Sequence, residues 1–98
     1  MNSVDERTKR LIIAVISAII PEAKIILFGS RARSDFSPRS DIDVAIDAGK
    51  VIDIRLMGEA RDMIDASNIS LGIDIVDVHA ISKSMAENIR KEGIIWKS

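Results

Sequence analysis

Two aspartates, Asp41 and Asp43, have the residue type and spacing that metal-dependent chemistry requires. They lie in residues 41–47, where apolar and mainly acidic side chains alternate, a pattern that predicts a β-strand with one acidic face. On such a strand their Cα atoms are about 6.7 Å apart on the same side, so both carboxylates can reach ions a few Å apart. Asp47 shares this face but lies about 13 Å from Asp43, too far to join them. Carboxylate oxygens are ligands that Mg²⁺ prefers.

The acidic face also has a simpler interpretation, because acidic residues that alternate along a strand are often just its solvated side. Two properties of the pair favour a site. Aspartate is depleted in strands, and two carboxylates about 4 Å apart repel by about 4 kcal/mol at an effective dielectric constant of 20. A bound cation would relieve that repulsion. Asp41 and Asp43 alone leave both interpretations open.

A phosphate-binding turn precedes the aspartates. Residues 24–28 form a continuous apolar run typical of a buried strand, which Gly29 ends. Glycine lets a phosphate approach the main chain closely, the amide groups of the following turn point toward it, and Ser30 adds a hydroxyl donor. Positive charge in the same segment comes from three arginines: Arg31, Arg33 and Arg39.

The remaining elements must bring the turn beside the aspartates. The sequence pattern predicts helices over residues 4–20, 51–66 and 84–91, a helical turn over 30–35, and strands over 24–28, 41–47, 71–78 and 94–96. Ser84 and Glu87 have the spacing of a capping box for the last helix. Because only about a dozen residues join the first two strands, too few for a parallel crossover, we predict that these strands are antiparallel. The connection over residues 48–69 suits a parallel crossover. We predict one α/β domain, residues 1–98, with helices packed against a mixed sheet.

Composition excludes several classes of protein. Net charge is -1, with 47% hydrophobic and 30% charged residues, so no basic surface for nucleic acid is expected. There is no cysteine, which excludes disulfides and thiolate metal sites and fits a cytoplasmic location. The apolar run at residues 11–20 is far shorter than the ~20 residues of a membrane-spanning helix. Oligomeric state is not determined by the sequence.

Gly29-Ser30, ten further residues and then Asp41-x-Asp43 resemble the signature of the DNA polymerase β-like nucleotidyltransferase superfamily. The segment FGSRARSDFSPRSDIDVAID is similar to the smallest branch of this superfamily, the minimal nucleotidyltransferases. The resemblance continues through the segments GIDIVDV and ENIRKEGIIW. The family has a third carboxylate on a later strand. Asp74 and Asp77 are three residues apart and point to opposite faces, so only one can join the site, and the family pattern favours Asp74. Ser34 stands where the family often has glycine, which bears on the shape of the turn.

The resemblance implies a polymerase β-like fold and transfer of a nucleoside monophosphate, with ATP as donor and two Mg²⁺ ions bound by Asp41, Asp43 and Asp74. It implies nucleotide binding by the turn: Gly29, Ser30, Arg31 and Arg33. After the sheet and its helices are built, no residues remain for an acceptor-binding domain, so the acceptor is expected on another protein. Members of the family resemble antitoxins of small all-helical HEPN-type RNase toxins, some of which receive AMP on a tyrosine. Two alternatives remain open: a non-catalytic module that neutralises its partner by contact, and transfer to a small molecule.

Overall fold

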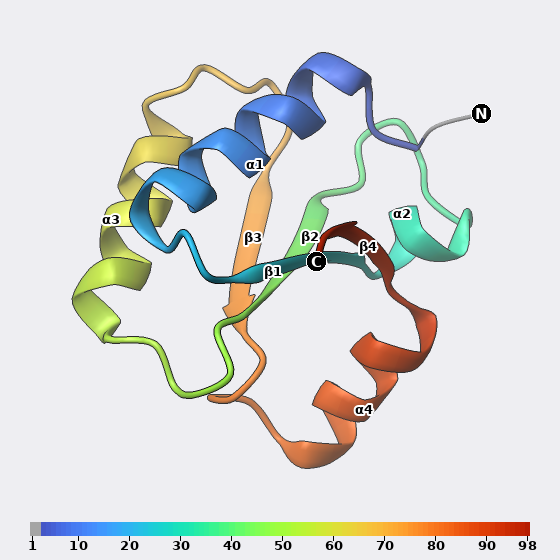
Figure 1. Cartoon of the computed structure of the whole chain (residues 1–98). Helices are drawn as coiled ribbons and strands as arrows, with labels where there is room; N and C mark the ends of the chain where they lie inside the picture. Colours follow the sequence, from blue (N-terminus) through green and yellow to red (C-terminus); the bar gives the residue numbers. More distant parts are fainter. Residues whose placement is uncertain (1–2) are drawn as a thin grey trace.

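The computed structural model describes residues 3–98, in which four helices alternate with four strands (Figure 1). In chain order these elements are α1 (Glu6–Ile19), β1 (Lys24–Phe28), α2 (Ser30–Arg33), β2 (Ile42–Asp47), α3 (Ile54–Asp65), β3 (Ile73–Asp77), α4 (Lys83–Glu92) and β4 (Ile94–Lys97). Every helix and strand that the sequence pattern predicts is present. None of the helices formed by residues 3–98 is long and apolar enough to span a membrane.

The four strands form one mixed sheet in the order β3-β2-β1-β4. β1 pairs antiparallel with both β2 and β4, whereas β2 and β3 run parallel. The short connection predicted antiparallel strands for β1 and β2, and the long connection through α3 predicted parallel strands for β2 and β3. Both predictions are confirmed. This arrangement places the end of β1 beside the start of β2.

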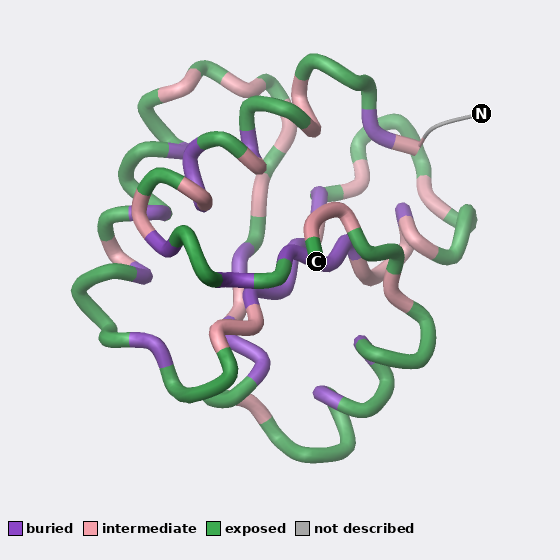
Figure 2. Tube along the Cα trace, viewed as in Figure 1, coloured by how far each residue is buried: buried purple, intermediate pink, exposed green. Residues whose placement is uncertain are grey.

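The sheet is covered unequally on its two faces. α1 and α3 pack against one face, where they enclose the larger core, which includes Ile12, Ile16, Ile25, Val44 and Ile46. α4 covers only part of the other face and encloses a smaller cluster: Ile26, Ala45, Val78, Ala86 and Ile89. Figure 2 shows that buried residues concentrate in the central strands. The sheet face predicted to be acidic therefore also has an apolar part under α4, which includes the fully buried Ala45.

Several element ends differ from the predicted ones. α4 begins after Ser82, whose hydroxyl accepts a hydrogen bond from the Met85 amide at 3.2 Å, so the predicted cap at Ser84 is wrong. α3 begins at Ile54 instead of residue 51, because the Ile52 amide donates to the Asp77 carboxylate, 2.7 Å away, and is held outside the helix. Asp53, the residue before Ile54, caps α3: its carboxylate accepts a hydrogen bond from the Arg55 amide.

Candidate active site

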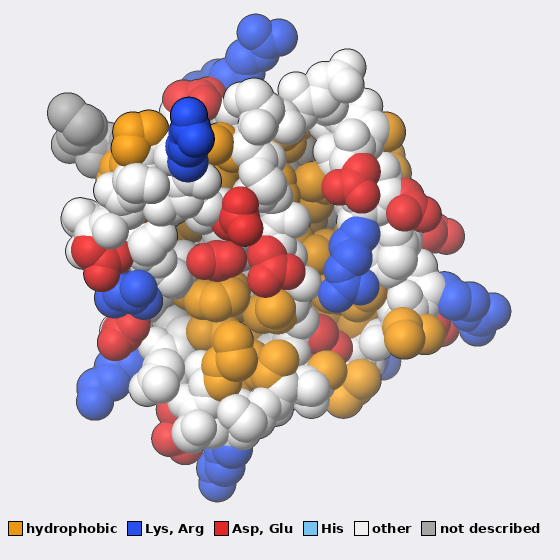
Figure 3. All heavy atoms as spheres, turned by 180° about the vertical axis from the view of Figure 1, so that it is seen from behind, with side chains coloured by type: hydrophobic (Ala, Val, Ile, Leu, Met, Phe, Trp, Pro, Cys, Tyr) orange, Lys and Arg blue, Asp and Glu red, His pale blue; other side chains and the backbone are white. Residues whose placement is uncertain are grey.

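Strand register gathers the three predicted carboxylates on one face. Asp43 is opposite Phe28 of β1 on one side and Asp74 of β3 on the other. Asp41 lies one residue before β2, and its carboxylate rests against the chain that enters β3: a Cβ at Gly72 would be 2.5 Å from Asp41 Oδ1. Figure 3 shows acidic side chains gathered near the centre of this face, with hydrophobic side chains beside them.

The carboxylates influence one another electrostatically. Burial raises the pKa of Asp43, and the charges of Asp74 and Asp41 raise it further, against a smaller opposing effect of Arg33. Asp43 is half-buried, whereas Asp41 and Asp74 are exposed. The cluster therefore holds negative charge that its own protein surroundings do not balance.

Divalent metal binding fits this set of oxygen donors. Within residues 3–98, no three acidic, histidine or cysteine side chains are arranged to hold a metal ion by themselves. Mg²⁺ is usually bound by one or two carboxylates together with water and substrate phosphates, so a site completed by a nucleotide needs no such arrangement. The raised pKa of Asp43 gives a physical reason for a cation there, because a positive ion relieves the repulsion that raises it.

The glycine turn lies directly against the Asp43 carboxylate. Gly29 has φ 74°, a conformation that side-chain-bearing residues rarely adopt, and a Cβ at this position would overlap Asp43 Oδ2. Ser30 opens α2 directly after it. The predicted phosphate-binding turn and the predicted metal-binding aspartates are therefore in direct contact, although they are separated by ten residues of sequence.

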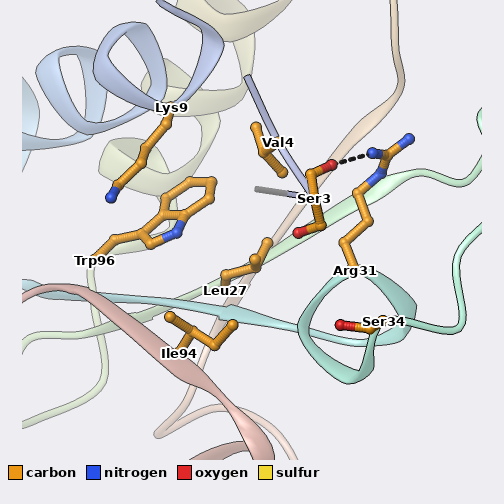
Figure 4. A pocket seen from close by; sticks show the side chains of 8 residues that line it. All are labelled: Ser3, Val4, Lys9, Leu27, Arg31, Ser34, Ile94 and Trp96. Carbon is orange, nitrogen blue, oxygen red and sulfur yellow. Dashed lines mark hydrogen bonds between the residues drawn. The ribbon is translucent and has the colours of Figure 1, made fainter. Parts of the chain in front are cut away.

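Arg31 takes a different place from the one that the resemblance implies. Its side chain is buried, with 5% of the residue exposed, and stacks 4.7 Å from the centre of the Phe36 ring. Its guanidinium donates to four main-chain carbonyls, those of Ser3, Ser37, Pro38 and Ser40 (the Ser3 bond is drawn in Figure 4). Because its donors are used by Ser3 and by three carbonyls of the loop before β2, Arg31 positions these segments of the chain, and this placement does not support a contact with nucleotide.

Arg33 is the arginine of the turn that acts on the site. It is exposed, its charge lowers the pKa of Asp43, and it forms ion pairs with Asp35 at 3.3 Å and with Glu92 at 3.9 Å. An exposed arginine with weak partners can turn toward an incoming phosphate, so the position of Arg33 is compatible with the nucleotide-binding role that the resemblance implies.

The other aspartates of β2 and β3 have structural partners. Asp77 is buried and accepts hydrogen bonds from the amides of Ile52 and His79, as expected for a residue on the opposite face from Asp74. Asp47 is 2.8 Å from the His79 ring and also accepts from the Gly49 amide. Burial acts to raise the pKa of Asp47, but the hydrogen bonds from Gly49 and His79 outweigh it, so the pKa is lowered.

Two features of the site were not identified from sequence. Gly72 provides the space in which the Asp41 carboxylate lies, and a glycine directly before a strand is a signal that could have revealed it. The second is a stripe of α4 that faces Gly29 and Arg33 across a hollow: Met85, Asn88, Ile89 and Glu92. Nothing in the local sequence marks that stripe, because its role depends on how α4 crosses the sheet.

The fold and the site together define a class of protein. Asp43 on β2, Asp41 one residue before that strand, Asp74 on the neighbouring parallel strand and the glycine turn form one arrangement. Such an arrangement is suited to metal-assisted transfer of a phosphate-containing group. The family profile described as polymerase beta, nucleotidyltransferase matches residues 14–98. The chain belongs to this family and is a nucleotidyltransferase.

Similar proteins point to one branch of the family. The chain is 24% identical over 81 residues to a Haemophilus influenzae protein named "Probable protein adenylyltransferase MntA", covering 83% of this chain and 71% of that protein. A solved toxin–antitoxin structure with AMP-PNP has a TM-score of 0.75 and 27% identity, over 90% of this chain and 71% of that one. The MNT antitoxin in complex with a tri-AMPylated Shewanella oneidensis HEPN toxin has a TM-score of 0.71 and 25% identity, over 93% and 70%.

Proposed function

We propose that this protein transfers AMP from ATP to a hydroxyl group of a HEPN-type toxin, in a Mg²⁺-dependent reaction, and so acts as the antitoxin of that partner. The observation that carries the proposal is the register that sets Gly29 against Asp43 and Asp43 beside Asp74. The similarity to an adenylyltransferase and to an antitoxin in complex with a HEPN toxin supports the donor and the partner.

Asp41 and Asp43 are the residues that would hold Mg²⁺, with Asp74 sharing one of two ions. When bound, Mg²⁺ neutralises phosphate charge and lowers the pKa of an acceptor hydroxyl. In the proposed complex, Gly29 and Ser30 bind the β- and γ-phosphates of ATP through the main-chain amides and the Ser30 hydroxyl. Arg33 adds positive charge at the same place.

The lateral order of the strands supports an in-line reaction. Gly29 follows β1, Asp43 is on the central strand β2, and Asp74 is on the edge strand β3. With pyrophosphate leaving on the Gly29 side, the acceptor oxygen attacks the α-phosphorus from the Asp74 side. A new O–P bond forms, the bond from the α-phosphorus to the bridging oxygen breaks, and Asp74 accepts the hydroxyl proton. Asp74 is exposed, as a residue that meets a protein acceptor must be.

A transfer assay tests the proposal. The protein is incubated with a HEPN-type toxin, MgCl₂ and labelled ATP, and compared with the Asp41→Asn/Asp43→Asn double variant. Asp62→Asn/Asp65→Asn, which removes two exposed carboxylates of α3, is the matched control. Label is expected on the toxin with wild type and control, and loss of both labelling and neutralisation with the double variant. If all three proteins silence the toxin equally without transferring label, the enzyme proposal is wrong and neutralisation occurs by contact.

A further inference from the structure

An apolar hollow of about 350 Å³ lies at β3, an edge strand of the sheet, against the start of α3. Five side chains supply most of its apolar surface: Val51, Ile54, Met57, Val76 and Ile81. Two of them are largely exposed, Val51 at 62% and Ile54 at 81%. Exposed apolar residues gathered around a recess mark a surface that binds a ligand or another protein. We call this recess the edge hollow.

The buried carboxylate of Asp77 fixes two walls of the edge hollow. It accepts hydrogen bonds from the Ile52 amide at 2.7 Å and from the His79 amide at 2.9 Å. These bonds tie the segment before α3 and the turn after β3 to the end of the strand. The edge hollow is therefore a preformed recess, as binding sites usually are.

Arg61 of α3 connects the edge hollow with the proposed site. Its side chain lines the hollow and also a smaller recess of about 170 Å³, which Asp74 lines as well. The guanidinium donates to the Ile75 carbonyl at 3.3 Å. The order along β3 is therefore Asp74, then Arg61 at Ile75, then the edge hollow at Val76, within about 10 Å of strand. Figure 3 shows basic and hydrophobic side chains next to the acidic cluster.

Arg61 also has the capacity to bind an acidic group. A guanidinium has five N–H donors, and the Ile75 carbonyl takes one of them. Within residues 3–98, Arg61 is exposed, forms no ion pair and is the only basic residue that lines either recess. Its fork of N–H groups matches a carboxylate. An acidic side chain of a partner is repelled by the carboxylates of the site and attracted at Arg61.

We propose that this edge binds the acceptor-bearing segment of the partner protein, with an acidic side chain of the segment on Arg61 and an apolar one in the edge hollow. The inference rests on the proposed nucleotidyl transfer. That reaction puts the nucleotide phosphates on the β1 side of Asp43 and the acceptor oxygen on the Asp74 side, which leaves the β3 edge for the partner. The apolar side chain lies about three extended residues from the acceptor. Because Arg61 occupies the Ile75 carbonyl, side chains bind the segment, which is not added to the sheet as a strand.

Transfer from labelled ATP to a HEPN-type toxin, measured at varied toxin concentration, tests the inference. Arg61→Ala is expected to raise KM for the toxin about tenfold while kcat and the affinity for ATP are kept. Added NaCl is expected to reduce this increase, because salt screens the charge pair, and Arg61→Lys is expected to recover part of the lost binding. Ile54→Thr is expected to raise KM about fourfold, the equivalent of one buried CH₂ group.

Two matched controls are expected to keep the wild-type KM. Arg55→Ala removes another exposed arginine of α3, which lines neither recess. Ile95→Thr changes an exposed isoleucine of β4, on the opposite edge of the sheet. Unchanged circular dichroism and melting temperature of all variants confirm that they are folded.

The outcomes separate this inference from the proposed function. If wild type labels the toxin and both Arg61→Ala and Ile54→Thr keep its KM, the inference is overturned while transfer stands. If Arg61→Ala lowers kcat or ATP affinity at an unchanged KM for the toxin, Arg61 acts elsewhere and the inference is likewise overturned. A wild-type dimer that Ile54→Thr dissociates, in sedimentation, would assign the edge hollow to a second copy of the chain instead. If wild type transfers no label, both the inference and the proposed function fail.

Discussion

Replacing Asp43 with asparagine is expected to stabilise the metal-free protein while abolishing its activity. Asp43 is half-buried, and burial and the charges of Asp74 and Asp41 raise its pKa. At neutral pH its ionised carboxylate is therefore in an unfavourable place. Asparagine has nearly the same shape and no charge, so Asp43→Asn removes the repulsion and keeps the packing against Gly29.

The magnitude follows from the register. Asp43 and Asp74 are directly opposite on neighbouring strands, which are about 4.8 Å apart. Two unit charges at about 5 Å repel by about 3 kcal/mol at an effective dielectric constant of 20 and by about 0.8 kcal/mol in bulk water. Because Asp74 and Asp41 are exposed, the value near the water limit applies, and we expect a gain of about 1 kcal/mol. For a domain of this size that is an increase of about 4–8 °C in melting temperature.

The pH dependence has a definite sign. With its folded-state pKa raised above the ordinary value of 3.8, Asp43 binds a proton more tightly in the folded protein than in the unfolded chain. The resulting stability is complete below the ordinary pKa and is lost as pH rises through the folded-state pKa. The difference between wild type and Asp43→Asn is therefore expected to be small near pH 3.5 and to reach its full value at neutral pH.

The assay is thermal unfolding in EDTA across that pH range, with Asp62→Asn on α3 as the control for loss of an exposed carboxylate. Adding MgCl₂ and ATP is expected to stabilise wild type more than Asp43→Asn, since a ligand stabilises the state that binds it. A marked fall in the melting temperature of metal-free Asp43→Asn at neutral pH would show that the carboxylate is structural, and the electrostatic reasoning would be wrong.

Three further outcomes are expected. Gly29→Ala should weaken ATP binding and lower the melting temperature, because its Cβ overlaps the Asp43 carboxylate; an unaffected variant would contradict the close approach. Arg31→Ala should destabilise the protein by about 2–3 kcal/mol in denaturant unfolding, because it removes a buried side chain and its hydrogen bonds to four carbonyls. Arg33→Ala should keep stability and lower transfer, and the reverse pattern would exchange their roles. Asp47→Asn should cost about 1 kcal/mol at pH 7 and progressively less as pH falls through the lowered folded-state pKa, measured by urea unfolding; a cost independent of pH would rule out the charged hydrogen bonds as its source.

Sequence alone determined the parts of the site that depend on local periodicity and connection length. Strand alternation put Asp41 and Asp43 on one face and separated Asp74 from Asp77, because successive side chains of a strand point to opposite sides. The short return after Gly29 required antiparallel strands, which brought the turn to the aspartates. These features depend on short stretches of sequence, so they can be predicted before the fold is known.

Tertiary structure decided what depends on contacts between distant segments. The Arg31 side chain is buried because it binds main-chain carbonyls of the loop before β2 and of Ser3. The residues next to Arg31 in the sequence give no sign of these contacts. The burial of Ala45 and the hollow beside Gly29 both follow from the way α4 packs over part of the second face of the sheet. The aspartates and the glycine turn were therefore predicted from the sequence. Which arginine of the turn remains exposed near the carboxylates, Arg33, and the hollow beside Gly29 depend on how distant segments pack together.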